Sequence, residues 1–223
     1  MLILFDVNGV LCFKCHDESK LKISSKDLVN AASYMMILRP GIREVLKRLS
    51  QEHTLGIFSS TTFKNVVPVV KELEKSGIKF AITAYREYTQ LDPDYLKNVS
   101  IQSFDTIKRL ETIWSHPFFN SNRQWDSTNT LLVDDSAVKT RFIDPDNVLV
   151  IPSFDYVEYV RQDTLENFEQ NIWMALTNLR LKHAHVQDSL ISSLETPESL
   201  AMVPTQSSCP ETSQESDQSC QST

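Results

Sequence analysis

Short apolar runs recur along the chain, and each run is bounded by polar residues or glycine. Leu2–Phe5, which stops at Asp6, has the length of a strand buried on both faces, where apolar residues need not alternate with polar ones. Similar runs follow at intervals that leave room for a helix between neighbours. We expect strands at Leu2–Phe5, Thr54–Phe58, Lys79–Thr83, Asn129–Val133 and Val148–Ile151.

Between these runs, apolar residues recur at helical spacing. Ile42, Val45, Leu46 and Leu49 share one face of a helix over Gly41–Leu49. Strands that alternate with helices form a parallel sheet with helices on both faces. The pattern therefore predicts an α/β fold with a doubly wound, Rossmann-like parallel sheet. The same helical spacing recurs over Phe63–Lys75, with Pro68 as a local disturbance, over Phe104–Trp114 and over Thr164–Leu181.

The composition changes near residue 185. Residues 186–223 contain no Lys, Arg or aromatic residue, hold six acids, and are rich in Ser, Thr and Gln. Such a segment buries too little apolar surface to offset the entropy of ordering it. In a chain of 223 residues, we expect one folded domain at 1–185 and a disordered acidic tail at 186–223.

The net charge and the length of the apolar runs both argue against nucleic-acid and membrane partners. The tail holds six of the seven net negative charges, so the domain is near neutral and offers no basic field for nucleic acid. No apolar run reaches membrane-spanning length, and no basic segment precedes the first strand as in a signal peptide. We expect a cytoplasmic or nuclear protein with no direct nucleic-acid or membrane partner. Its oligomeric state stays open.

Cys12, Cys15 and His16 match the C-x-x-C-H pattern of c-type haem attachment. Haem would need an export route and a second axial ligand, and neither is visible in the sequence. Zinc would need a second pair of ligands, and the other two cysteines, Cys209 and Cys220, lie in the tail. We therefore expect Cys12 and Cys15 to be ordinary thiols on or beside a strand. We also expect the histidines to be surface residues.

Polar residues follow three of the predicted strands. They are the segments Asp6–Gly9, Ser59–Thr62 and Asp134–Ser136. In a doubly wound sheet, the carboxyl ends of the strands open into one crevice, so these segments converge there. Converging carboxylates repel one another unless a cation lies between them, and oxygen ligands of this kind suit Mg²⁺.

These residues predict a Mg²⁺-assisted phosphoryl-transfer site with the Asp6 carboxylate as nucleophile. Ser59 and nearby backbone amides would hold phosphate oxygens, and Lys108, on an intervening helix, would balance the negative charge. A structural interpretation competes, because Asp, Asn and Ser are also common in turns and helix caps. Three such clusters in order, each after an apolar strand, favour the site.

The same residues resemble motifs of the haloacid dehalogenase superfamily. Within it, they are similar to the FCP/SCP branch, which contains RNA polymerase II C-terminal domain phosphatases and NLI-interacting-factor-like proteins. The resemblance covers about residues 1–175. It rests on Asp6-Val7-Asn8-Gly9-Val10-Leu11 (family pattern D-x-D-G-x-L), Leu38-Arg39-Pro40-Gly41 (LRPG), Gly56–Ser60, Lys108-Arg109-Leu110 with Ile113-Trp114, and Thr128–Ser136 with Lys139.

The resemblance implies a Mg²⁺-dependent phosphatase that acts on phosphoserine or phosphothreonine in proteins or peptides. Asp6 would attack phosphorus and form a phosphoaspartate. It also implies a small flap, partly a hairpin, between Cys12 and Leu38, with Ser33–Leu38 as its returning strand. The resemblance also implies that Ser59 hydrogen-bonds the transferring phosphoryl group and that Lys108 balances its negative charge. Ser60 and Arg86 would contact phosphate. The implied Mg²⁺ ligands are Asp6, Asp135 and the backbone carbonyl of Asn8, with support from Asp134.

One position departs from the family pattern. Asn8 stands where the family has the Asp that protonates the leaving group and later activates water. An amide does neither at neutral pH, and general acid–base catalysis is typically worth about 10²–10⁴-fold in rate. Two interpretations therefore stand, a weak phosphatase and a catalytically silent phosphoprotein-binding or scaffold protein.

Overall fold

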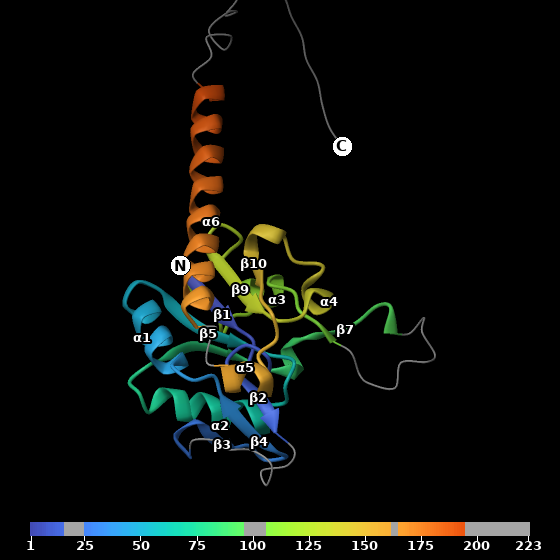
Figure 1. The fold of residues 1–223 in the computed structure, drawn as a ribbon. Helices are drawn as coiled ribbons and strands as arrows, with labels where there is room; N and C mark the ends of the chain where they lie inside the picture. The colour runs from blue at the N-terminus through green and yellow to red at the C-terminus, as the bar shows by residue number, and fades with distance from the viewer. Residues whose placement is uncertain (16–24, 96–105, 162–164, 195–223) are drawn as a thin grey trace, which may run out of the picture. The chain divides into compact units, whose positions relative to one another are not determined.

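The computed structural model describes residues 1–15, 25–95, 106–161 and 165–194, and its centre is a five-stranded sheet (Figure 1). All neighbouring strands in this sheet are parallel, and the order is β10-β9-β1-β5-β6. The predicted α/β fold with a parallel sheet is confirmed, and each predicted strand end is correct to within one residue. The strands are β1 (Leu2–Phe5), β5 (Thr54–Phe58), β6 (Phe80–Ala84), β9 (Thr130–Asp134) and β10 (Val148–Val150).

The central strand β1 is buried on both faces. Ile3 and Phe5 belong to one apolar core, whereas Leu2 and Leu4 belong to another on the opposite side of the sheet. Because both faces are covered, the strand is a continuous apolar run. Its register pairs Leu2 with Thr54 of β5 and with Thr130 of β9, so the three strands end together.

Helices cover the two faces of the sheet. The core around Ile3 and Phe5 takes apolar residues from α1 (Ile42–Glu52), α2 (Phe63–Glu74) and α6 (Leu165–Leu194). Pro68 lies inside α2 without ending it. The core around Leu2 and Leu4 takes Ile113 from α3 (Glu111–Ser115). The other helices are α4 (Ala137–Thr140) and α5 (Tyr156–Arg161), with short 3₁₀ segments at Ser25–Asp27, Arg86–Tyr88 and Pro145–Asn147.

A second, antiparallel sheet forms the expected flap. Its order is β2-β4-β3, with β2 at Cys12–Cys15, β3 at Leu28–Asn30 and β4 at Met35–Leu38. Cys12 and Cys15 are buried thiols on β2, and burial raises the pKa of the Cys12 thiol well above its ordinary value. The expectation of thiols on a strand is thus confirmed, while His16 lies outside the described residues.

Three expectations need correction or qualification. The helix predicted over Phe104–Trp114 is wrong in its first half, because Thr106–Ile107 form β8, which pairs with β7 (Gln90–Leu91). Helix α6 continues to Leu194, past the predicted boundary at residue 185, and residues 195–223 lie outside the described part. His53 is buried rather than exposed.

His53 packs against the Trp173 ring, with the ring centroids 5.1 Å apart. Burial lowers the pKa of His53, so its environment favours the neutral imidazole. Among the described residues, no helix combines the length and apolar character needed to cross a membrane.

Candidate active site

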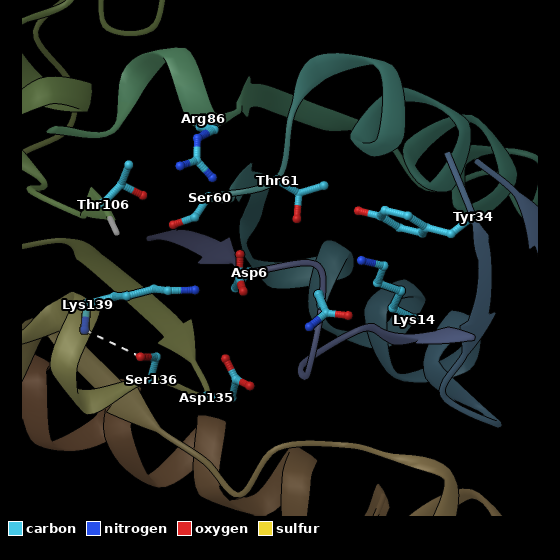
Figure 2. A pocket seen from close by; sticks show the side chains of 11 residues that line it. Asp6, Lys14, Tyr34, Ser60, Thr61, Arg86, Thr106, Asp135, Ser136 and Lys139 are labelled. Carbon is cyan, nitrogen blue, oxygen red and sulfur yellow. Dashed lines mark hydrogen bonds between the residues drawn. The ribbon is translucent and has the colours of Figure 1, made fainter. Parts of the chain in front are cut away.

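A cavity of about 480 Å³ lies at the carboxyl ends of β1, β5 and β9. Figure 2 shows the Asp6 side chain within the ring of residues that line it. Carboxyl ends of neighbouring parallel strands are where ligands bind in open α/β sheets. The described residues that line the cavity are Asp6, Asn8, Lys14, Tyr34, Ser60, Thr61, Arg86, Thr106, Asp135, Ser136 and Lys139.

A buried ammonium links two of the clustered carboxylates. Lys108 Nζ lies 2.9 Å from Asp6 Oδ1 and 2.5 Å from Asp134 Oδ2, and the Lys108 side chain is fully buried. Burial opposes the charge of Lys108, but the two carboxylates outweigh it, so the pKa of Lys108 is raised. Burial raises the pKa of Asp134, and the charge of Lys108 only partly offsets that rise. The pair Lys108 and Asp134 forms the floor beneath Asp6.

Lys108 reaches this position from a loop, not from the helix predicted for it. It follows β8 directly, and its backbone N–H donates to the carbonyl of Lys139 at 2.8 Å. This contact joins the loop to α4, next to the end of β9. The position of the ammonium is therefore set by a tertiary hydrogen bond, which local sequence preference does not encode.

The carboxylates suit a hard divalent cation. Carboxylate oxygens of Asp6, Asp134 and Asp135 lie within 4.8 Å of one another. Asp134 is committed elsewhere, because its second oxygen accepts a 2.8 Å hydrogen bond from the backbone N–H of Ser136. Asp6 and Asp135 remain as candidate ligands, and Asn8 lines the same cavity. Oxygen donors of this kind, in a cavity with room for water and phosphate, fit Mg²⁺.

Gly9 allows Asp135 to approach the loop after β1. Its φ is +85°, and a Cβ at this position would lie 2.0 Å from Asp135 Oδ2. The loop is held by backbone bonds, because the Gly9 N–H donates to Cys12 and its carbonyl accepts from Phe154, both at 2.7 Å. A side chain at residue 9 would therefore displace the Asp135 carboxylate rather than the backbone.

We expect Gly9→Ala to weaken Mg²⁺ binding by roughly 10–100-fold, because it moves one ligand carboxylate. It should also cost about 1–2 kcal/mol of stability, because φ is positive. Gly77→Ala is the matched control, since Gly77 has φ +87° with nothing within 4 Å of the added Cβ. Calorimetric Mg²⁺ titration and urea unfolding measure the two effects. Equal Mg²⁺ affinity in the two variants would contradict this account.

The eight residues singled out from the sequence fall into two layers. Asp6, Asn8, Ser60, Arg86 and Asp135 line the cavity, while Ser59, Lys108 and Asp134 are buried and are absent from its described lining. The Ser59 hydroxyl accepts a hydrogen bond from the backbone N–H of Thr61 at 3.2 Å. Ser59 thus lies behind the wall that Ser60 and Thr61 form.

Two hydroxyls in the wall are available to a ligand. The Oγ of Ser60 and the Oγ1 of Thr106 are buried and have no hydrogen-bond partner among the described residues. Buried hydroxyls without partners are costly, so they favour a ligand that accepts from them. Together with Arg86 and Lys139, they present donors suited to phosphate oxygens.

The sequence reasoning did not assign Lys14, Tyr34 or Lys139 to the site. A signal existed for Lys139, which lies three residues after Ser136, the residue whose hydroxyl accepts from the Lys139 N–H at the start of α4. A residue in the first turn after β9 must lie near the end of that strand. No such signal existed for Lys14 and Tyr34, because their position depends on how the flap packs.

Known proteins resemble this chain over most of its length. The sequence profile of the NLI interacting factor-like phosphatases matches residues 1–177. An uncharacterized FCP1 homology domain-containing protein of Schizosaccharomyces pombe is 29% identical over 141 residues, which are 62% of this chain and 55% of that protein. The match therefore spans about half the length of this curated relative.

One of two similar solved structures supports the same fold. A variant of the fission yeast RNA polymerase II CTD phosphatase Fcp1, bound to beryllium fluoride, has a TM-score of 0.50 at 14% identity, covering 86% of this chain and 55% of that chain. Another structure of Fcp1, an essential RNA polymerase II CTD phosphatase, has a TM-score of 0.49 at 15% identity, covering 88% and 55%. At 14% identity, the first likeness concerns the fold alone.

Proposed function

The chain belongs to the NLI interacting factor-like phosphatases, the FCP/SCP-type branch of the haloacid dehalogenase superfamily, and on that basis we propose that it is a Mg²⁺-dependent aspartyl phosphatase. The proposed substrates are phosphoserine and phosphothreonine in proteins or peptides. The observation that carries the proposal is the Asp6 carboxylate, which lines the cavity and lies 2.9 Å from the buried Lys108 ammonium.

Asp6 is the proposed nucleophile. One of its oxygens bonds to phosphorus while the bond from phosphorus to the substrate oxygen breaks, leaving a phosphoaspartate and a departing alkoxide. Water then attacks phosphorus, which releases inorganic phosphate and restores the Asp6 carboxylate. Lys108 lies against the Asp6 carboxylate and offsets its negative charge, and, being fully buried, it does not itself touch the substrate.

Residues around Asp6 supply the remaining interactions of this proposal. Asp6, Asp135 and the backbone carbonyl of Asn8 would hold Mg²⁺, with support from Asp134. Mg²⁺ held by these residues would supply positive charge to offset that of the phosphoryl oxygens. Donors on the cavity wall would bind those oxygens, namely Ser60, Thr106, Arg86 and Lys139. In this arrangement Ser59 supports the wall from behind, because its hydroxyl oxygen accepts from the Thr61 N–H.

Asn8 limits the rate in this proposal. Its amide has no proton to give to a departing serine or threonine alkoxide, and it does not take a proton from water. p-Nitrophenolate leaves without being protonated, so p-nitrophenyl phosphate should turn over more readily than a phosphoserine peptide. Asn8 also favours the alternative function, a silent module that binds a phosphoprotein without hydrolysing it.

We expect wild-type protein to hydrolyse p-nitrophenyl phosphate slowly with Mg²⁺, to stop when EDTA removes the metal, and to recover when Mg²⁺ is returned. Asp6→Asn should lower the rate to that of buffer, because an amide is not a nucleophile toward phosphorus. The two measurements test the metal and the nucleophile separately. A wild-type rate no greater than that of Asp6→Asn would contradict the proposed enzymatic activity. Phosphoprotein binding without hydrolysis would then be the remaining function.

We also propose that the protein lies in a reducing compartment of the cell. Cys12 and Cys15 are buried and are not joined in a disulfide, which suits a reducing compartment, the cytoplasm or the nucleus.

A further inference from the structure

The flap contributes one side of the cavity wall. Lys14 of β2 and Tyr34, which precedes β4, both line the cavity. In Figure 2 they lie together on one side of Asp6, and Lys139 lies on the other. Neither residue is needed for the proposed attack of Asp6 on phosphorus. Their presence in the wall therefore calls for another role.

Strand alternation directs Lys14 into the cavity. Its neighbours Phe13 and Cys15 pack in a small apolar cluster with Ile37 and Phe154. Because successive side chains of a strand point to opposite faces, Lys14 faces away from that cluster. The Phe13 cluster thereby fixes the face on which the ammonium emerges.

Tyr34 holds the ammonium without neutralising it. The Lys14 Nζ lies 4.2 Å from the centroid of the Tyr34 ring. A cation–π contact of this kind positions a charge, whereas a carboxylate partner would cancel it. The ring is anchored in turn, because the Tyr34 side chain hydrogen-bonds Asn65, and Asn65 accepts from the backbone N–H of Ser33 at 3.1 Å. The Lys14 ammonium thus presents N–H donors to the cavity while it lies against the Tyr34 ring.

The site carries one more positive charge than negative charge when a phosphate and a divalent cation are included. A phosphate dianion and one divalent cation cancel each other. The three clustered carboxylates are equal in number to the cations that line or underlie the cavity other than Lys14, two on the wall and one beneath it. Lys14 is then the surplus positive charge among the described residues of the site. The matched set is Asp6, Asp134 and Asp135 against Arg86, Lys108 and Lys139.

We propose that Lys14, positioned by Tyr34, forms a second anion subsite that selects substrates with another anionic group next to the phosphorylated residue. That group is a second phosphate or an Asp or Glu carboxylate, both of which accept hydrogen bonds from an ammonium. The inference rests on the proposed function, because it assumes that the phosphorylated residue enters this cavity. It names the substrate class, a phosphopeptide that carries adjacent negative charge.

The test uses the full chain with Mg²⁺ and three fluorescent peptides of one sequence. Each carries one phosphoserine, followed by Gln, by Glu or by a second phosphoserine. Binding is measured by fluorescence anisotropy. We expect wild type to bind one or both of the doubly anionic peptides roughly 3–10-fold more tightly than the Gln peptide, and less so at high salt. The Glu and phosphoserine arms show which anion the subsite takes.

Variants separate the charge of Lys14 from its shape. Lys14→Gln should remove the preference, and Lys14→Arg should keep it, because a guanidinium retains the charge. Lys64→Gln, at an exposed position of α2 outside the described cavity lining, should keep the wild-type preference. A preference that survives in Lys14→Gln, or that is absent from wild type, would overturn the inference.

The proposed function has its own readout in this experiment. If wild type hydrolyses p-nitrophenyl phosphate but shows no preference among the peptides, the subsite fails and the proposed function stands. If wild type neither hydrolyses that substrate nor binds the Gln phosphopeptide, both proposals fail together.

Discussion

Asn8→Asp is expected to raise the rate of p-nitrophenyl phosphate hydrolysis, and to raise phosphoserine peptide hydrolysis by more, about 10²–10⁴-fold. Asn8 lines the cavity beside Asp6 in the loop after β1, so a carboxyl group there would be near the leaving oxygen. Serine and threonine alkoxides are poor leaving groups, and they gain most from a proton donor. The measurement is kcat for both substrates in wild type and variant.

The gain must depend on the nucleophile. The double variant Asp6→Asn/Asn8→Asp should be inactive, because a general acid has nothing to assist once the attacking carboxylate is gone. A wild-type sample also needs peptide mass spectrometry at Asn8-Gly9, since deamidation of that pair would create the aspartate and imitate activity. An Asn8→Asp protein no faster than wild type would show that residue 8 is not the acid/base position.

The size of the wild-type rate decides between the two functions. If wild type turns over and Asn8→Asp is faster, the chain is a phosphatase that lacks one catalytic group. If wild type is silent and Asn8→Asp gains activity, the catalytic scaffold is intact and the native role is phosphoprotein binding. The remaining residues of the site would serve either function, because the proposed phosphate contacts of Arg86, Lys139 and the wall hydroxyls require no chemical step.

Lys108→Met is expected to destabilise the fold by about 3–5 kcal/mol, the loss typical of removing one partner from a buried ion pair. Lys108 is fully buried, and it is the cation in contact with both Asp6 and Asp134. Without it, the fully buried Asp134 carboxylate faces Asp6 with no ammonium between them. Urea unfolding in the presence of EDTA measures the loss without interference from a bound metal.

Lys139→Met is the matched control, because Lys139 is a cation of the same site that lies in the cavity wall and is only partly buried. It should lose far less stability. Adding Asp134→Asn to Lys108→Met should recover part of the loss, since it removes one of the orphaned charges. Similar losses in Lys108→Met and Lys139→Met would show that the buried ion pairs are not what holds this region.

The Lys108→Met loss should also depend on pH. Burial raises the pKa of Asp134, and removing the ammonium that partly offsets this raises it further. A carboxyl group with a raised pKa in the folded state binds a proton that the unfolded chain does not, so stability increases as pH falls. The loss should therefore be smaller at about pH 5 than at pH 7.

The amino-acid sequence by itself determined the α/β fold and the order of the chemical groups along it. Leu2–Phe5 was recognisable as a strand because a strand buried on both faces is a continuous apolar run. Asp6, Asn8 and Asp135 could be assigned to one crevice because carboxyl ends of neighbouring parallel strands must meet there. The departure at Asn8 was visible in the sequence as well, since it is a matter of residue type.

Only the tertiary structure decided which of these groups face the cavity. The sequence placed Lys108 on a helix, whereas β8 pairs with β7 and the Lys108 N–H bonds to Lys139, which puts the ammonium beneath Asp6. It likewise gave no reason to bring Lys14 and Tyr34 to the site. Periodicity reports which side of an element is buried, but distances between elements are set by how the whole core packs. Contacts such as Lys14 on Tyr34 therefore arise only when the flap and sheet are assembled.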